Sequence, residues 1–561
     1  MSSSLVIRNG TIVDGSGGDP YVADLAVRDG RIEAIGKNLP RGAEEIDARD
    51  RLVTPGFVDV HTHYDAQVTW DGGCTPSPWH GVTSVVLGNC GFGLAPCRPD
   101  GRERLLRMLE HVEGMPYASL VAGVPWNWES FADYLAMLRA RPLGPNVGVL
   151  LAHSTLRAHV MGDDAYVRAA REDEVAAMRA LVADGMAAGA LGLATSRSTG
   201  HVGEAGRPVP SRQASREELG QLVLAMASNG RGVLEITPET FPIAADELAW
   251  LQTLARESGR PVSFSAALDL PDRPDVWEPV YAALRAGRAT GAVVLPQVSC
   301  RPMQFDFDLD GGCSSLDAMP SWRRWRAAAS PDARVALARD ADFRASVRAD
   351  ALGRPDAPSS RRWADVVLAE AARPEHQVWL GHTLSAIARE RGGDVIDALL
   401  DVSVAEGLRA RFTMTLLNYD DARVGALLRQ PESLVALSDA GAHVSVLCDA
   451  GYATHFLGYW VRERGALGLE DAVRRLTSMP ASLYGIPECG RLAPDAVADI
   501  ACFDATRVAC RAGELLHDFP GGAARFVTRA DGVHHVLVAG VPVVDGGVPT
   551  DARPGRVLES G

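Results

Sequence analysis

The sequence predicts an α/β protein with two parts: a TIM-like (β/α)8 barrel and a small β-sandwich formed from both chain termini. Its 561 residues are enough for one large catalytic domain and an accessory module. The middle of the chain alternates short apolar strands with amphipathic helical stretches, the pattern of a parallel sheet. Both ends are instead rich in short strands and tight turns. An open doubly wound sheet is the alternative, but no GxGxxG motif follows an early strand.

Eight segments of the middle region have the composition of buried strands. Amphipathic runs such as REDEVAAMRALVADGMAAG separate most of them, which favours a closed barrel. We assign residues 54–487 to the barrel domain, with a helical insertion at about 301–430 between the seventh and eighth strands. The predicted strands are residues 56–63, 81–90, 146–153, 189–196, 232–239, 261–268, 291–300 and 433–443.

The two ends of the chain have the pattern of a second, all-β module. Asn9-Gly10 and Asp29-Gly30 each lie between β-rich runs, and such dipeptides favour hairpin turns because they tolerate positive φ. The segments GRLAPDAVADIACFD and GVHHVLVAGVPVVDGG repeat this pattern near the C-terminus. Residues 1–53 and 488–561 are therefore predicted to form one β-sandwich accessory domain.

Composition and charge narrow the class of partner. A formal net charge of −15 argues against a nucleic-acid partner, because binding phosphates needs clustered Lys and Arg. We find no apolar stretch long enough to cross a bilayer and no signal-peptide pattern at the N-terminus, so we expect no membrane association. Nine cysteines without a repeated spacing do not indicate a disulfide framework. We expect a cytoplasmic protein that acts on a small molecule, and a homo-oligomer is left open.

The segment GFVDVHTHYD is the most specific chemical signal. A buried strand leads to His61 and His63, whose side chains point the same way because strands have a period of two. Two imidazoles at one strand end can ligate one divalent ion. Two ordinary loop histidines are the alternative, but the strand context, the preceding TPG turn and Asp59 favour a metal site.

Two further residues end predicted strands of this region. Asp439 follows the last strand, and barrel closure would bring it beside the first, where a carboxylate can complete a metal shell and carry a proton. A helix N-cap is the alternative role for such an aspartate. Cys90 ends the second strand in a glycine-rich turn, where a thiolate can ligate zinc. A buried small hydrophobe is the alternative there.

Three weaker candidates lie near the same predicted mouth. His153 ends the third strand and either ligates the metal or holds substrate together with Arg157. His443 follows Asp439 by one helical turn and has the same two roles open to it. A purely structural role is an equal alternative for both histidines.

With these motifs the sequence resembles the amidohydrolase superfamily and, within it, the N-acyl-D-amino-acid deacylase (D-aminoacylase-like) family. The resemblance covers nearly the full length, including VTPGFVDVHTHYD, GVTSVVLGNCGFGLAPCRP, GALGLATS, LSDAGAH and GRLAPDAVADI. It implies a TIM-like barrel with a terminal β-sandwich, a zinc ion and hydrolysis of an acyl amide on a D-amino acid. It also implies roles for four residues: His61 and His63 as first-strand ligands, Cys90 as the metal-binding cysteine that replaces the carbamylated lysine of relatives, and Asp439 as the catalytic aspartate. The only lysine, Lys37, lies in the accessory part, which agrees with that replacement.

The fifth and sixth strands depart from the family pattern. They read VLEITPET and VSFSAALD and lack the histidines that the resemblance implies there, so Glu235 is the residue that offers an oxygen. We expect one Zn2+ near His61, His63, Asp439 and Cys90, and a second ion or another divalent metal is left open. The leading hypothesis is hydrolysis of an amide (non-peptide C–N) bond by metal-activated water, with Asp439 as general acid/base. The alternatives are a lactonase, a cyclic-imide hydrolase or another unusual reaction on the same barrel, and a non-catalytic ligand-binding barrel.

Overall fold

The computed structural model describes residues 4–310, 319–352 and 362–561. The chain divides into two compact units. The first consists of residues 1–268, 272–301 and 422–561, and the second of residues 269–271 and 302–421. All the candidate site residues belong to the first unit.

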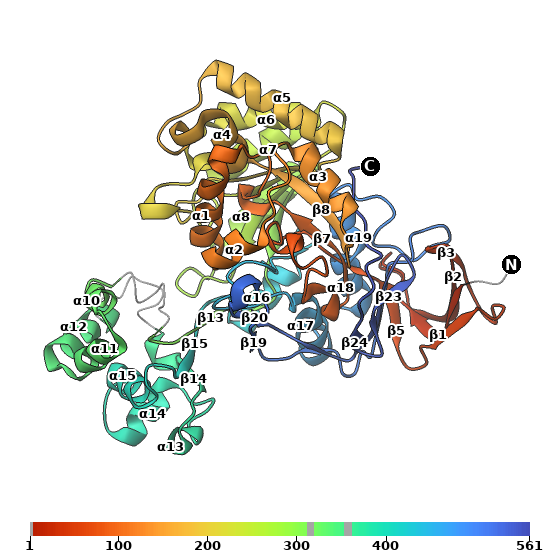
Figure 1. The fold of residues 1–561 in the computed structure, drawn as a ribbon. Coiled ribbons are helices and arrows are strands. Elements are labelled where there is room, and N and C mark those ends of the chain that lie inside the picture. Colours follow the sequence, from red (N-terminus) through yellow and green to blue (C-terminus); the bar gives the residue numbers. More distant parts are fainter. Residues whose placement is uncertain (1–3, 311–318, 353–361) are drawn as a thin grey trace. The chain divides into compact units, whose positions relative to one another are not determined.

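Eight parallel strands form the centre of the first unit (Figure 1). Each lies within one of the eight predicted ranges, so the prediction of an α/β fold built on a parallel sheet is confirmed. The sheet curls, and a parallel bridge between Thr62 and Ala440 links the segments that follow its two outermost strands. In order across the sheet the strands are β16 (Leu434–Val435), β12 (Val294–Val298), β11 (Val262–Ala267), β10 (Val233–Thr237), β9 (Gly192–Ser196), β8 (Asn146–Ala152), β7 (Val82–Leu87) and β6 (Phe57–Asp59).

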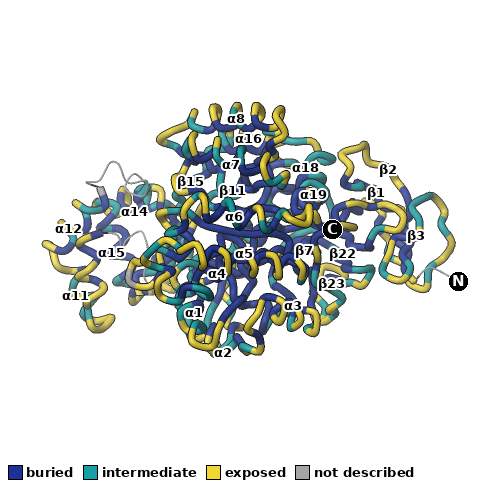
Figure 2. The backbone as a smooth tube through the Cα atoms, turned by 90° about the horizontal axis from the view of Figure 1, so that it is seen from above, coloured by how far each residue is buried: buried dark blue, intermediate teal, exposed yellow. Residues whose placement is uncertain are grey.

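Helices cover this sheet because its strands are apolar on both faces and need burial on both. Figure 2 shows buried strands such as β7 and β11 behind helices whose outer sides are exposed. Glycines with positive φ, such as Gly189 and Gly259, end helices before the next strand begins. The helices of this unit are α1 (Arg102–Glu113), α2 (Tyr117–Gly123), α3 (Phe131–Ala140), α4 (His153–Met161), α5 (Glu172–Ala188), α6 (Arg216–Ala227), α7 (Ala245–Ser258), α8 (Trp277–Ala289), α16 (Asp421–Leu428), α17 (Tyr452–His455), a π-helix (Phe456–Glu463), α18 (Leu469–Leu476) and α19 (Ser478–Leu483).

Strands from both ends of the chain share one nine-stranded sheet (Figure 1). The antiparallel pair of β5 and β17 joins the N-terminal strands to the C-terminal ones. These strands are β1 (Leu5–Ile12), β2 (Tyr21–Arg28), β3 (Arg31–Gly36), β4 (Glu44–Asp47), β5 (Leu52–Pro55), β17 (Ile500–Phe503), β22 (Val533–Val538), β23 (Val541–Asp545) and β24 (Val548–Pro549). Two short pairs accompany it, β18 (Ala509–Cys510) with β21 (Ala530–Asp531) and β19 (Glu514–Leu516) with β20 (Arg525–Val527).

One of the two predicted hairpin turns is wrong. Asp29-Gly30 does connect β2 to β3, with positive φ at both residues. Asn9-Gly10, however, lies inside β1, where the register with β2 shifts between Ile7 and Gly10. The positive φ of Asn9 therefore serves a bulge, not a turn.

The second unit contains a three-stranded sheet and six α-helices within its described residues. Its strands are β13 (Met303–Phe307), β15 (Arg411–Leu417) and β14 (Val367–Glu370), in that order. Stacked rings of Trp322, Trp325 and Phe343 form part of its interior. Its helices are α10 (Trp322–Ala327), α11 (Pro331–Arg339), α12 (Ala341–Leu352), α13 (Pro374–Gln377), α14 (Leu384–Arg391) and α15 (Val395–Ala405). In neither unit does any described helix combine the length and apolarity that a membrane span needs.

Candidate metal centre

The first strand delivers two buried imidazoles to one point. His61 and His63 follow β6, and their ring centroids are 5.3 Å apart. The backbone fixes this segment from both sides: Thr62 N–H donates to Val86 O of β7, and His63 N–H donates to Ala440 O, 2.7 Å away. The extended segment thus directs both side chains to the same side, as the period of two requires.

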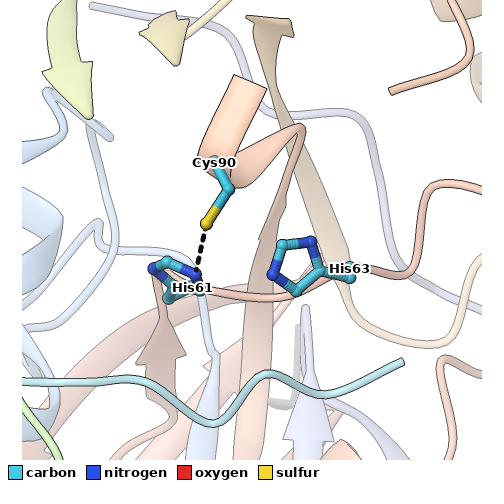
Figure 3. A group of neighbouring side chains, drawn as sticks. All are labelled: His61, His63 and Cys90. Carbon is cyan, nitrogen blue, oxygen red and sulfur yellow. Dashed lines mark hydrogen bonds between the residues drawn. The ribbon is translucent and has the colours of Figure 1, made fainter. Parts of the chain in front are cut away.

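The second strand places a thiol against this pair (Figure 3). Cys90 Sγ lies 3.5 Å from His61 Nε2. Cys90 has a φ of 54°, an uncommon conformation for a residue with a side chain, and Glu235 Oε2 accepts its N–H at 2.8 Å. Ligand atoms of His61, His63 and Cys90 all lie within 4.8 Å of one another.

The last strand brings a carboxylate to the same point. Asp439 Oδ1 is 3.2 Å from His61 Nε2 and 3.7 Å from His63 Nε2. Gly441 makes this approach possible, because a Cβ there would lie 2.7 Å from His63 O. The Asp439 side chain is 34% exposed, whereas both imidazoles are buried, so it is the member of the group that solvent reaches.

Burial and mutual charge set the protonation of these groups. Burial lowers the pKa of His61 to about 4 and raises the pKa of Cys90 to about 12, with Glu235 adding to the rise. Burial also opposes charge on His63, but the Glu113 and Asp439 carboxylates raise its pKa well above the ordinary value. The pKa of Asp439 is lowered despite burial, because the two imidazoles favour its charged form.

Two polar residues orient the imidazoles from behind. Gln297 Oε1 lies 2.6 Å from His61 Nδ1, and an amide oxygen only accepts, so this nitrogen carries the proton. Glu113 Oε1, from the end of α1, lies 3.3 Å from His63 Nδ1. Both Nε2 atoms are then the ones that face Asp439. Such outer partners of metal-binding histidines fix the tautomer and the ring orientation.

The four donor groups fit a divalent transition metal. Two imidazole nitrogens, one sulfur and one carboxylate oxygen, from His61, His63, Cys90 and Asp439, are ligands that zinc accepts. Two of the donors sit on left-handed residues, Cys90 and Asp439, and such strained backbone concentrates at functional sites. Ligand atoms of His61, His63 and Cys90 are mutually within 4.8 Å, and Asp439 Oδ1 joins them through its distances of 3.2 and 3.7 Å to the two imidazoles.

The other predicted residues take different positions. His153 is fully buried, with Nδ1 2.8 Å from Thr195 Oγ1 and Nε2 3.0 Å from Glu218 Oε1. Arg157 is also fully buried and bonds the same Glu218 carboxylate. The structure therefore joins these two residues in a separate network.

Glu235 and His443 are close to the centre but outside the ligand group. Glu235 accepts Cys90 N–H through Oε2 and the Ser265 hydroxyl through Oε1, 3.2 Å away. Its Oε1 is 4.0 Å from His61 Nδ1, on the side away from Asp439. His443 is partly exposed, and its N–H donates to Glu113 O. Its ring interacts electrostatically with Asp439 and His63.

Sequence reasoning missed three residues: Gln297, Glu113 and His201. Gln297 had a usable signal, because an amide in the apolar strand VVLPQVS must bond something when buried. Glu113 and His201 had none, since one reads as a helix face and the other as a loop residue.

Gln297→Leu should weaken metal binding because it removes the acceptor that holds His61 Nδ1–H. We expect the metal dissociation constant to rise about 10–100-fold, as for other outer partners of metal-binding histidines, measured by competition with a chelating dye. Gln252→Leu is the matched control: it removes a partly buried side-chain amide hydrogen bond to Ala283 O, between α7 and α8. Equal metal affinity in wild type and Gln297→Leu would show that Gln297 does not orient the His61 ring for metal binding.

The chain is similar to known proteins along most of its length. The family model described as the amidohydrolase family matches residues 44–544. The N-acyl-D-glutamate deacylase of Alcaligenes xylosoxydans xylosoxydans is 30% identical over 565 residues, covering 99% of this chain and 96% of the relative. A solved D-aminoacylase with a binuclear metal centre is 26% identical, covers 99% of this chain and all of its own, and has a TM-score of 0.66. The N-acyl-D-glutamate deacylase of Bordetella bronchiseptica, solved with zinc and a phosphonate mimic of the tetrahedral intermediate, is 25% identical, with full coverage of both chains and a TM-score of 0.67.

Proposed function

The chain belongs to the amidohydrolase family, and we propose that it is a metal-dependent N-acyl-D-amino-acid deacylase, which cleaves an amide bond other than a peptide bond. In this proposal residues 54–487 form a (β/α)8 barrel, and residues 1–53 and 488–561 form a β-sandwich. The observation that carries the proposal is the position of Asp439 Oδ1, which faces both imidazoles of the His61–His63 pair. The names of the similar deacylases support the choice of substrate.

We assign one Zn2+ to the group formed by His61, His63, Cys90 and Asp439. A bound divalent ion of this kind lowers the pKa of water to about 7 and polarises a carbonyl oxygen. The fifth and sixth strands bring Glu235, Thr237 and Ser265 next to Cys90: Thr237 Oγ1 is 3.3 Å from Cys90 Sγ and 3.2 Å from Ser265 Oγ. Both oxygens of Glu235 already accept hydrogen bonds, from Cys90 N–H and from the Ser265 hydroxyl, and this favours one ion over two.

Asp439 moves the proton in this scheme. Its Oδ1 faces the imidazoles, which leaves Oδ2 free to accept a proton from the attacking water. The same oxygen then donates that proton to the leaving nitrogen, so the amide splits into a carboxylic acid and an amine. The low pKa of Asp439 keeps its carboxylate ionised at neutral pH, the only form that can take up the proton.

Substrate contacts are assigned to the open side of the centre. His443 lies there, partly exposed and close to Asp439. His153 and Arg157 receive no such role in this proposal, because both are fully buried and bonded to Glu218.

A substrate panel tests the reaction. Zinc-loaded protein should release acetate from N-acetyl-D-amino acids and act more slowly on the L-enantiomers, on lactones and on cyclic imides. Acetate and free amine should appear in equal amounts, because one amide bond is cut. Turnover of lactones or cyclic imides without any amide hydrolysis would show that the protein is a lactonase or a cyclic-imide hydrolase and not a deacylase. Binding without turnover of any class would leave only a ligand-binding barrel.

A further inference from the structure

A fourth histidine, His201, lies beside the metal centre and has no part in the scheme above. It follows β9, and its Nδ1 is 2.7 Å from Ser196 Oγ at the end of that strand. Its ring lies 5.3 Å from the ring of Phe92, two residues after Cys90. Its side chain is partly exposed, unlike those of His61 and His63.

A close contact between two strand ends brings the segment that carries His201 next to Cys90. Gly91, next to Cys90, allows the end of β9 to come very close: a Cβ there would lie 2.9 Å from Thr195 Cα. The segment after Ser196 therefore starts against the turn that holds Cys90. Consistent with this, the His201 ring interacts electrostatically with His63, His443 and Asp439.

The hydrogen bonds fix which ring nitrogen carries the proton. Ser196 Oγ accepts the N–H of Ser198 at 3.2 Å, and its own proton then has His201 Nδ1 as acceptor. The proton of the neutral ring is therefore on Nε2. That nitrogen has no hydrogen-bond partner among residues 4–310, 319–352 and 362–561. Burial lowers the pKa of His201 to about 4, so the ring is neutral near pH 7.

Two N–H donors of the metal centre already have hydrogen-bond acceptors within the protein. Cys90 N–H bonds Glu235, and His61 Nδ1–H bonds Gln297. The single lysine, Lys37, lies after β3 in the terminal sheet. The N–H groups of Cys90 and His61 and the side chain of Lys37 therefore offer no donor to a carbonyl oxygen that enters the centre.

We propose that His201 Nε2–H donates a hydrogen bond to the carbonyl oxygen of the substrate and stabilises the negative charge that this oxygen gains when water attacks. The inference rests on the proposed amide hydrolysis. A neutral N–H donor suits this task because its hydrogen bond to the oxygen becomes stronger as negative charge develops there. The donor keeps its own proton throughout. Ser196 acts on the reaction through His201, as a positioning residue that keeps the proton on Nε2.

Four variants test this inference. His201→Leu should lower kcat/KM about 10²–10³-fold, the usual effect of losing one such donor, while metal content stays at the wild-type level. His201→Gln restores an N–H donor and should recover part of the loss. Ser196→Ala should have an intermediate effect. His535→Leu, in the terminal sheet, is the matched control for loss of an imidazole.

Inhibition supplies a readout that a structural role would not change. The probe is the phosphonate analogue of the N-acetyl-amino acid that wild type hydrolyses fastest. Its inhibition constant should rise in proportion to the loss of kcat/KM across the His201 variants, while KM changes little. If His201→Leu kept kcat/KM within threefold of wild type, the inference would be overturned. If wild type hydrolysed no amide at all, the proposed function would fail first, a result recognisable without any variant.

Discussion

Asp439→Asn should abolish most turnover while leaving the fold intact. Asn has nearly the same size as Asp but cannot accept a proton from water at neutral pH, so the proton has no carrier to the leaving nitrogen. We expect kcat/KM to fall by about 10³-fold or more, at the upper end of what general acid–base catalysis supplies. The measurement is acetate release with zinc in excess, so that any loss of metal affinity does not limit the rate.

The controls separate proton transfer from metal loss and from unfolding. The thermal midpoint of unfolding should stay near wild type. Metal content measured with zinc in excess should also stay near wild type, because the two imidazoles and Cys90 still bind the ion although one of the four donors is changed. Asp545→Asn, which removes an exposed carboxylate 2.9 Å from His535, is the matched control and should leave kcat/KM unchanged. Full activity of Asp439→Asn under these conditions would exclude Asp439 as the proton carrier.

The strands of the central sheet were predictable because their signal is local. Each is a short apolar run between polar stretches, and all eight predicted ranges contain one strand of the parallel sheet. The strands are shorter than the ranges because the chain leaves the ladder where the site begins, as at His61 and Asp439. Asn9-Gly10 shows the limit: whether such a pair makes a turn or a bulge depends on how β1 pairs with β2, and that is not local information.

The predicted insertion at about 301–430 also contains strand pairing that local sequence does not predict. Its helices follow from Ala- and Arg-rich runs, but the sequence analysis expected only helices between residues 301 and 430. The structure adds β13, β14 and β15. Of these, β13 and β15 pair across more than 100 residues, as between Met303 and Leu417, and β14 pairs with β15. Isolated short strands such as QFDF and VLAE carry too little periodicity to be distinguished from loops.

For the site, the residues that carry motifs were predictable and their supports were not. His61, His63, Cys90 and Asp439 end strands, so the topology alone predicts that they converge. Gln297 is different: it is buried in the middle of β12, and its role depends on the ring nitrogen of His61 that it meets across the curled sheet. His153 illustrates the converse. It ends a strand as His61 does, but its side chain packs against α6, where Glu218 binds it.

The histidines that end strands are of two kinds: His61 and His63 belong to the metal group, whereas His153 bonds Glu218. His61→Ala and His63→Ala should each lose the bound metal, because each removes one nitrogen from a group of four donors. The loss of metal affinity should exceed the roughly 10–100-fold that outer partners contribute. Their folds should persist, because the sheet is held by backbone hydrogen bonds and apolar contacts that neither ring supplies. Metal per chain after dialysis, measured by elemental analysis, is the direct readout, and activity should fall with it.

His153→Ala is the control that makes this result specific. The variant leaves Glu218 Oε1 without one of its buried partners, so stability should fall by about 1–3 kcal/mol, the cost of an unmet buried polar group. Metal content should nevertheless match wild type, since both ring nitrogens of His153 are already engaged, one by Thr195 and the other by Glu218. The expected pattern is thus a crossed one: metal loss without unfolding for His61 and His63, and destabilisation without metal loss for His153. Retention of stoichiometric metal by both His61→Ala and His63→Ala would place the ion elsewhere and remove the basis of the proposed hydrolase.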